Sequence, residues 1–321
     1  MGTGDSRRAL RLKWWAMDRA IAIKQRLPRE LYQDPPEWVG YLLLLPGLAL
    51  VSLLFVGMVL LTGYSVLTFD PFEFIVYEVT AENWRQVLST PGYREIFVRT
   101  IGLSTLVTVL AVALALPYAY LTVRVRSAIV RKGLLVGLFV PFFTGVIVRA
   151  YGWLIVLGRN GLVNSVLGAA GVEPVRLLST RFAVVVGLLQ IMTPLAIIMI
   201  APAVQNVDRS LELAASNLGA NRATTFRRIV IPLAAPGIAG ATIVVFTISA
   251  ATFAIPDLLG GGQVDFMANL IYRSLFDSGN YPLAAALSVA LVIAASTVVL
   301  VIFRTLGAGT FGVNTGGGTD E

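Results

Sequence analysis

The 321-residue sequence contains no cysteine and no histidine, and only 13% of its residues are charged. Without cysteine the chain can form no disulfide and no thiolate metal site. Without histidine it lacks both the commonest metal ligand and the commonest general acid or base. We therefore expect no metal site and no catalytic residues in this chain.

Apolar residues dominate the composition instead. Hydrophobic residues make up 56% of the chain, 30 residues are glycine, and the mean hydropathy is +0.79. Soluble domains are roughly 45–50% apolar even when glycine is counted, so a soluble globular enzyme is excluded. The net charge of +7 is typical of a membrane protein with basic cytoplasmic loops, and we expect no nucleic-acid partner.

Six hydrophobic stretches are long enough to cross a membrane as helices, since a bilayer needs about 20 apolar residues. They lie at 40–67, 98–122, 133–157, 182–204, 233–256 and 283–303. The third stretch is interrupted by Pro141, Arg149 and Tyr151. The sequence therefore predicts an all-α membrane protein with six transmembrane helices.

The distribution of basic residues predicts the orientation of these spans. Lys and Arg gather in 1–38, 123–132 and 205–232 and at Arg304, whereas the loops on the opposite side carry Asp and Glu. Basic loops remain in the cytoplasm. We therefore expect both termini in the cytoplasm, in a multi-pass protein of the bacterial inner membrane.

The two ends of the chain differ from the spans in composition. Residues 1–38 are basic and include Trp and Leu, which suits either a helix on an anionic membrane surface or an ordinary charged extension. Residues 39–68 are assigned to the first transmembrane helix. The glycine-rich tail, 306–321, is predicted to be disordered.

The longest polar connection, 206–232, has a helical pattern. Four of its apolar residues share one helix face: Leu211, Ala214, Ala215 and Leu218. Asp208 or Ser210 can cap the start of this helix, and Gly219 suits its end. Small side chains on such a face favour docking into a groove of another protein, although a surface helix that only returns the chain to the membrane is the alternative.

The same segment resembles the EAA loop of ABC-importer permeases, in which Glu-Ala-Ala is followed after three residues by Gly and after nine more by Ile-x-Leu-Pro. The residues that match in register are Ala214, Ala215, Gly219, Ile229 and Pro232. Leu213 stands where the family has Glu, and Ile231 replaces Leu. Glu212 is one position earlier and points about 100° away around the helix.

This resemblance implies that the loop contacts a cytoplasmic ATPase dimer, which binds ATP and Mg²⁺, while this chain holds no cofactor. The implied coupling residues are Leu211, Glu212, Ala214, Ala215, Leu218, Gly219, Ala220, Phe226 and Pro232. Residues 259–263 look like an ATPase signature, but no Gly-x-x-x-x-Gly-Lys-Ser/Thr loop accompanies them. We therefore expect that the chain is not an enzyme.

Residues 93–305 resemble the core of these permeases, which implies the type I (MetI-like) permease fold. Within the core, 141–164 and 255–261 resemble the spermidine/putrescine branch. The resemblance implies a polyamine as the solute, a heterodimer with a second, homologous permease, and an extracytoplasmic solute-binding protein. Membrane lipid is the remaining expected partner.

Several polar and aromatic residues are candidates for the solute pathway, since a cationic amine is bound by carboxylates and aromatic faces and since intramembrane charge is costly. They are Arg149, Tyr151, Trp153, Gln190, Thr193 and Asp257. For the aromatic residues the alternative is an interfacial belt or packing role. Arg149 would not itself attract a polycation, which favours packing or gating.

Three other functions remain open at this point. The first is an importer permease for another solute, such as an opine, ferric iron or thiamine. The second is a self-sufficient secondary transporter or channel, which would call for acidic groups in the middle of a span. The third, a membrane-embedded enzyme, would need a catalytic cluster that the sequence does not offer.

Overall fold

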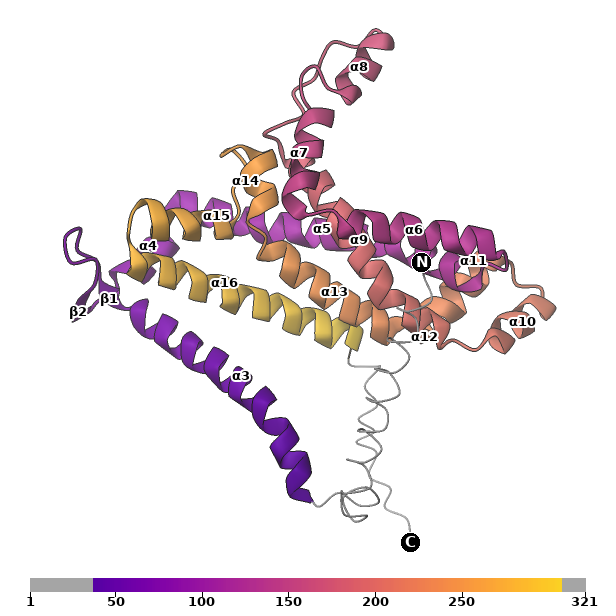
Figure 1. The fold of residues 1–321 in the computed structure, drawn as a ribbon, viewed down its shortest axis with the longest axis horizontal. Helices are drawn as coiled ribbons and strands as arrows, with labels where there is room; N and C mark the ends of the chain where they lie inside the picture. The colour runs from indigo at the N-terminus through magenta and orange to yellow at the C-terminus, as the bar shows by residue number, and fades with distance from the viewer. Residues whose placement is uncertain (1–36, 308–321) are drawn as a thin grey trace, which may run out of the picture. The chain divides into compact units, whose positions relative to one another are not determined.

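The computed structural model describes residues 37–307, which are mostly helical and include one short hairpin (Figure 1). The predictions for 1–36 and 308–321 lie outside these described residues. The long helices are α3 (Glu37–Tyr64), α5 (Pro91–Arg124), α6 (Ala128–Phe143), α9 (Arg181–Gln205), α13 (Ala235–Ala250) and α16 (Tyr281–Ile302). The shorter ones are α4 (Glu82–Ser89), α7 (Val146–Val156), α8 (Leu162–Ala169), α10 (Arg209–Asn217), α11 (Arg222–Thr225), α12 (Ile231–Leu233), α14 (Ala254–Gly260) and α15 (Met267–Tyr272), with π-helical turns η1 (Phe226–Val230), η2 (Arg273–Asp277) and η3 (Phe303–Gly307).

Helix α3 corresponds to the predicted first span. The chain divides after Leu60 into two compact units, and α3 supplies the described part of the first. Its 28-residue sequence is largely apolar and includes Pro46, and its mean hydropathy of 2.6 suits a membrane. Because a residue rises about 1.5 Å along a helix, this length exceeds the hydrocarbon core.

The second unit is built on three helices, α5, α9 and α13, that pack pairwise against one another. Small residues allow this close approach. Ala111, Ala115 and Ala119 recur every fourth residue on the buried face of α5 and are fully buried. On α13, Gly237 lies against Ala203 of α9 so closely that a side chain there would collide. Pro117 lies inside α5, between the buried residues Ala115 and Ala119.

Helix α16 covers α13 and packs against α4 and α15 at its beginning (Figure 1). A second small core fills this corner, where Val87 of α4 and Met267 of α15 meet Leu287 of α16. The hairpin, strands β1 (Leu67–Thr68) and β2 (Val76–Val79), lies nearby, and the side chain of Asn83 donates hydrogen bonds to the carbonyls of Ser65 and Leu67. The core and the hairpin therefore close one end of the bundle.

The predicted count of six spans is not confirmed. In the described part of the chain four helices are long and apolar enough to cross a membrane, with a fifth if α11–α12 and α13, bent by 73°, form one span. The third predicted stretch is divided between α6 and α7, because Thr144 and Gly145 leave the helical conformation and Gly145 begins a new helix. Each half is shorter than a bilayer requires.

The packing of α14 against α9 yields a first prediction. A Cβ atom on Gly187 would lie 2.5 Å from Cδ1 of Leu259 and 3.0 Å from Cγ2 of Ile255. Gly187→Val should therefore lower the free energy of unfolding by about 1–3 kcal/mol, as overpacked cores do. Gly240→Val is the control, since the space beside Gly240 is open within the described chain. Equal midpoints of thermal unfolding for the two variants in detergent would contradict this packing.

Candidate functional site

The connection 206–232, called the coupling loop from here on, begins with the helix α10 and a side-chain cap. Oδ1 of Asp208 accepts a hydrogen bond from the backbone N–H of Ser210 at 2.8 Å, as the cap prediction requires. That backbone hydrogen bond holds the pKa of the Asp208 carboxyl below its usual value. The cap fixes where the helix starts, and therefore which residues face outward.

The end of α10 is a Schellman motif. Gly219 has φ of +85°, a left-handed conformation that glycine adopts without steric cost. The N–H of Ala220 donates to the carbonyl of Ala215 at 2.9 Å, and the N–H of Gly219 donates to that of Ser216 at 3.0 Å. The predicted helix stop at Gly219 is confirmed. The left-handed Gly219 turns the chain sharply toward α11. At the start of α11, the side chain of Asn221 accepts a hydrogen bond from the backbone N–H of Thr224.

Glu212 points inward, to the end of α5. One carboxylate oxygen lies 2.7 Å from a guanidinium nitrogen of Arg124, and the other accepts a hydrogen bond from the Tyr120 hydroxyl at 2.8 Å. The side chains of Arg124 and Glu212 are only 16% and 12% exposed. Arg124 also donates to the carbonyl of Val207 at 2.6 Å. We call Glu212, Arg124 and Tyr120 the latch, since they join α10 to α5.

A ring contact extends the latch to the next span. The rings of Tyr120 and Phe226 meet edge to face with centroids 5.0 Å apart. Phe226 starts the π-helical turn η1, which leads into Pro232 at the start of α12. Pro232 fits there because the first turn of a helix has no use for its missing N–H. The coupling loop is thus held at both ends by one aromatic side chain of α5.

The leucines of the coupling helix α10 and its C-terminal cap are exposed. Leu211, Leu213 and Leu218 are 45%, 57% and 89% exposed, and no residue of this helix is buried. Ala214 is exposed as well, and Ala215 and Ala220 are half-buried. Of the nine predicted coupling residues, Glu212 and Phe226 therefore lie inward, toward α5. Leu211, Ala214 and Leu218 share one side of the helix and Leu213 lies on another, and all four are left exposed by the described residues.

The residues predicted for the solute pathway do not gather into one site. Trp153 of α7 and Gln190 of α9 meet, and the indole N–H donates to the Gln190 carbonyl oxygen at 2.6 Å. Trp153 also packs against the main core. Tyr151 on the same helix is 56% exposed. Thr193 lies half-buried one turn beyond Gln190. Because 37 residues separate Trp153 from Gln190, the sequence does not indicate their hydrogen bond.

Arg149 lies half-buried on α7. Its Nε atom is buried and has no hydrogen-bond partner among the described residues, and no carboxylate there pairs with its guanidinium group. A charge in this position calls for a partner from outside the chain or a path to the membrane surface.

Asp257 on α14 is exposed, and Asn269 links it to Phe253, the first of a row of aromatic rings that the sequence did not single out. Asn269 donates to the carbonyl of Phe253 at 3.2 Å and approaches the Asp257 carboxylate at 3.5 Å. Phe253, Tyr272 and Phe276 then follow in series, with centroids 4.8 and 4.7 Å apart. A carboxylate beside aromatic faces is the surface that organic ammonium groups favour.

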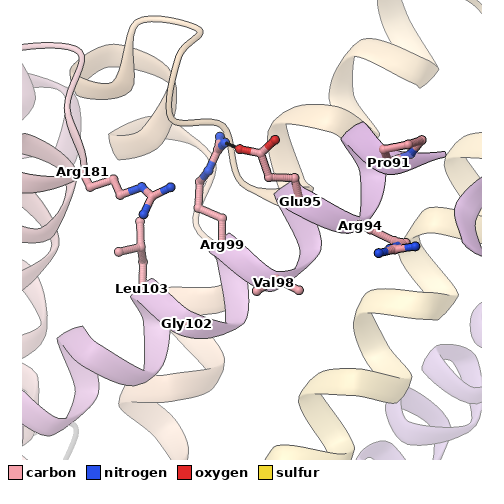
Figure 2. Close-up of a pocket in the computed structure, with 8 residues that line it drawn as sticks. All are labelled: Pro91, Arg94, Glu95, Val98, Arg99, Gly102, Leu103 and Arg181. Carbon is pink, nitrogen blue, oxygen red and sulfur yellow. Dashed lines mark hydrogen bonds and ion pairs between the residues drawn. The ribbon is translucent and has the colours of Figure 1, made fainter.

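Two ion pairs at this end of the bundle were also not singled out from the sequence. Asp265 is buried and pairs with Arg273 at 2.7 Å. Arg99 pairs with Glu95 on α5 and donates to the carbonyl of Gln263. Figure 2 shows this pair at the edge of a hollow of about 500 Å³, with Arg181 reaching in from the start of α9. Asp265 differs from Asp257 in its burial and in its ion pair, and the sequence reveals neither.

Comparison with known proteins identifies the family. Residues 109–308 match the family described as binding-protein-dependent transport system inner membrane component. The chain belongs to this family. It is therefore an ABC-importer permease, and its relatives are transport permeases rather than enzymes.

Relatives and a solved structure agree with this assignment. The chain is 32% identical to the spermidine/putrescine transport system permease protein PotB of Escherichia coli K12 over 79% of this chain and 93% of that protein. It is 29% identical to the protein of the same name from Haemophilus influenzae over 83% and 90%. The crystal structure of a bacterial alginate ABC transporter in complex with an alginate-bound periplasmic protein superposes with a TM-score of 0.71 at 20% identity, covering 87% and 97%, which shows the permease fold.

The latch yields a second prediction. Glu212→Gln keeps a hydrogen bond to Tyr120 but removes the ion pair with Arg124, whose side chain is mostly buried. We expect the free energy of unfolding to fall by about 1–3 kcal/mol. Glu95→Gln is the matched control, because Glu95 is 64% exposed in its pair with Arg99. This substitution should lower the free energy of unfolding by about 1 kcal/mol or less. If thermal unfolding in detergent gives the two variants the same loss, Glu212 is not a structural anchor.

Proposed function

We propose that this permease is one half of the solute pathway of an ATP-driven importer for polyamines such as spermidine and putrescine. The similarity to PotB proteins, at 29–32% identity over 79–83% of the chain, is the observation that carries the solute class. The other half is a second, homologous permease. An extracytoplasmic binding protein delivers the solute, and both termini of this chain lie in the cytoplasm.

The coupling loop is the proposed contact with the ATPase dimer, which binds ATP and Mg²⁺. The uncovered leucines and Ala214 of α10 supply an apolar surface for a groove in that partner. Glu212 and Phe226 act from the inner side of the loop. Through Arg124 and Tyr120 they join α10 to α5, so a displacement of the docked helix is passed to a span of the pathway.

Asp257 and its row of aromatic rings are the best placed of the candidate groups to receive a polyamine. The carboxylate pairs with an ammonium group, and the faces of Tyr272 and Phe276 stabilise the neighbouring charge through cation–π contact. The hollow with Arg99 and Arg181 is lined mainly by positive charge instead. It suits acidic groups of the binding protein rather than the solute.

A third prediction tests the ATPase contact. Leu218 is 89% exposed, so Leu218→Glu should change the stability of the isolated permease by about 0.5 kcal/mol or less. It should reduce co-purification of the ATPase about tenfold or more, because a carboxylate enters an apolar groove. Leu88→Glu on α4, where Leu88 is 68% exposed, is the control that leaves the ATPase bound. Full retention of the ATPase by the Leu218 variant would show that α10 docks elsewhere.

A fourth prediction tests the solute. In cells that contain the rest of the transport system, deletion of this chain should abolish uptake of radiolabelled putrescine and spermidine. Re-expression of the chain should restore this uptake. The same cells with an ATPase that cannot hydrolyse ATP should take up neither. Unchanged polyamine uptake on deletion would shift the solute to an opine, ferric iron or thiamine, and uptake without ATP hydrolysis would indicate a secondary transporter or channel.

A further inference from the structure

Two neighbouring hollows lie at the end of the bundle that carries the coupling loop. Their volumes are about 510 and 420 Å³, and both are lined by Arg124, Val125, Arg126 and Arg209. Together they form one depression between α10, the end of α5 and the start of α6. We call it the basic cleft, after its six cationic residues: Arg124, Arg126, Arg131, Lys132, Arg209 and Arg222.

The positive charge of the basic cleft is not neutralised within the described chain. Glu212 is the single carboxylate among the residues that line the two hollows, and its charge is matched by Arg124 at 2.7 Å. The other five cations form no ion pair with any residue between 37 and 307. Like charges held this close repel one another, and an anion that enters the cleft relieves this repulsion.

The backbone adds to the positive electrostatic potential of the basic cleft. Helix α6 begins at Ala128, which lines the cleft, and the N–H groups of its first turn carry the positive end of the helix dipole. Ser127 accepts a hydrogen bond from the N–H of Val130 at 3.4 Å and so starts this turn. A phosphate group placed in the cleft thus meets side-chain and main-chain donors together.

Apolar side chains next to the cleft determine the kind of phosphate ligand. Leu121 lines the larger hollow from the apolar helix α5 and is 55% exposed. Ile129 and Val130, in the first turn of α6, are 83% and 48% exposed. A cationic hollow with apolar side chains beside it, at the end of a span, matches a molecule that has an anionic head and an acyl chain.

We propose that the basic cleft binds the phosphate of an anionic phospholipid, whose acyl chains lie along Leu121 and α6. The bound phosphate bridges the α5–α6 connection, through Arg126 and Arg131, to α10, through Arg209. It also offsets the charge around Arg124, which holds Glu212 in the latch. Lipid occupancy therefore steadies the coupling loop against α5.

The test compares two double variants of the full chain in detergent by native mass spectrometry with added dioleoyl phosphatidylglycerol or dioleoyl phosphatidylcholine. Arg126→Gln with Arg131→Gln removes two charges from the cleft. Arg227→Gln with Arg228→Gln is the control, since these exposed cations lie on the coupling loop but outside both hollows. We expect the cleft variant to bind phosphatidylglycerol about tenfold more weakly than the natural chain, and the control to bind it unchanged. Binding of phosphatidylcholine should be weak throughout.

Three outcomes would overturn the proposal. Equal losses in both double variants would mean that phosphatidylglycerol responds only to overall charge. Displacement of the lipid by millimolar inorganic phosphate, or equal binding of glycerophosphoglycerol without acyl chains, would mean that the ligand is a soluble phosphate. Unchanged lipid binding, with loss of the ATPase from the assembled complex, would assign the cations of the cleft to acidic groups of that partner.

Discussion

The close approach of α5 to α9 is the contact on which the rest of the structure depends. In a membrane, lipid tails are as apolar as the side chains, so helices associate through close packing rather than through exclusion of water. The buried alanines on α5 provide a surface without bulk, and Gly237 of α13 does the same where α13 meets Ala203 of α9. Because α5 and α9 are fixed side by side, Arg124 at the end of one reaches the carbonyls at the end of the other. The latch therefore depends on the packing of α5 against α9.

Local features of the coupling loop were predictable because they depend on neighbours in the sequence. The cap at Asp208 and the left-handed Gly219 follow from side-chain chemistry and backbone sterics within a few residues. The sequence also placed Glu212 on a different face from the family's Glu. It did not reveal what that face meets, since Tyr120 is 92 residues away.

Predictions that depended on distant contacts succeeded less well. The third hydrophobic stretch was long enough for a span, yet Gly145 begins a new helix inside it, and composition does not fix where an apolar segment breaks. Trp153 and Gln190 were both singled out, but their hydrogen bond joins separate helices. Asp257 and Asp265 look alike in sequence, and only the fold exposes one and buries the other.

Pro117 gives α5 a point at which the helix can bend, close to the latch. Proline has no N–H, so the carbonyl of Ala113 loses its helical hydrogen bond, and a helix bends most easily at such a point. Tyr120 and Arg124 lie just beyond it, on the segment attached to the latch. A displacement of α10 would therefore tilt the last two turns of α5 at Pro117, while Ala111 and Ala115, which precede Pro117, stay packed in the core.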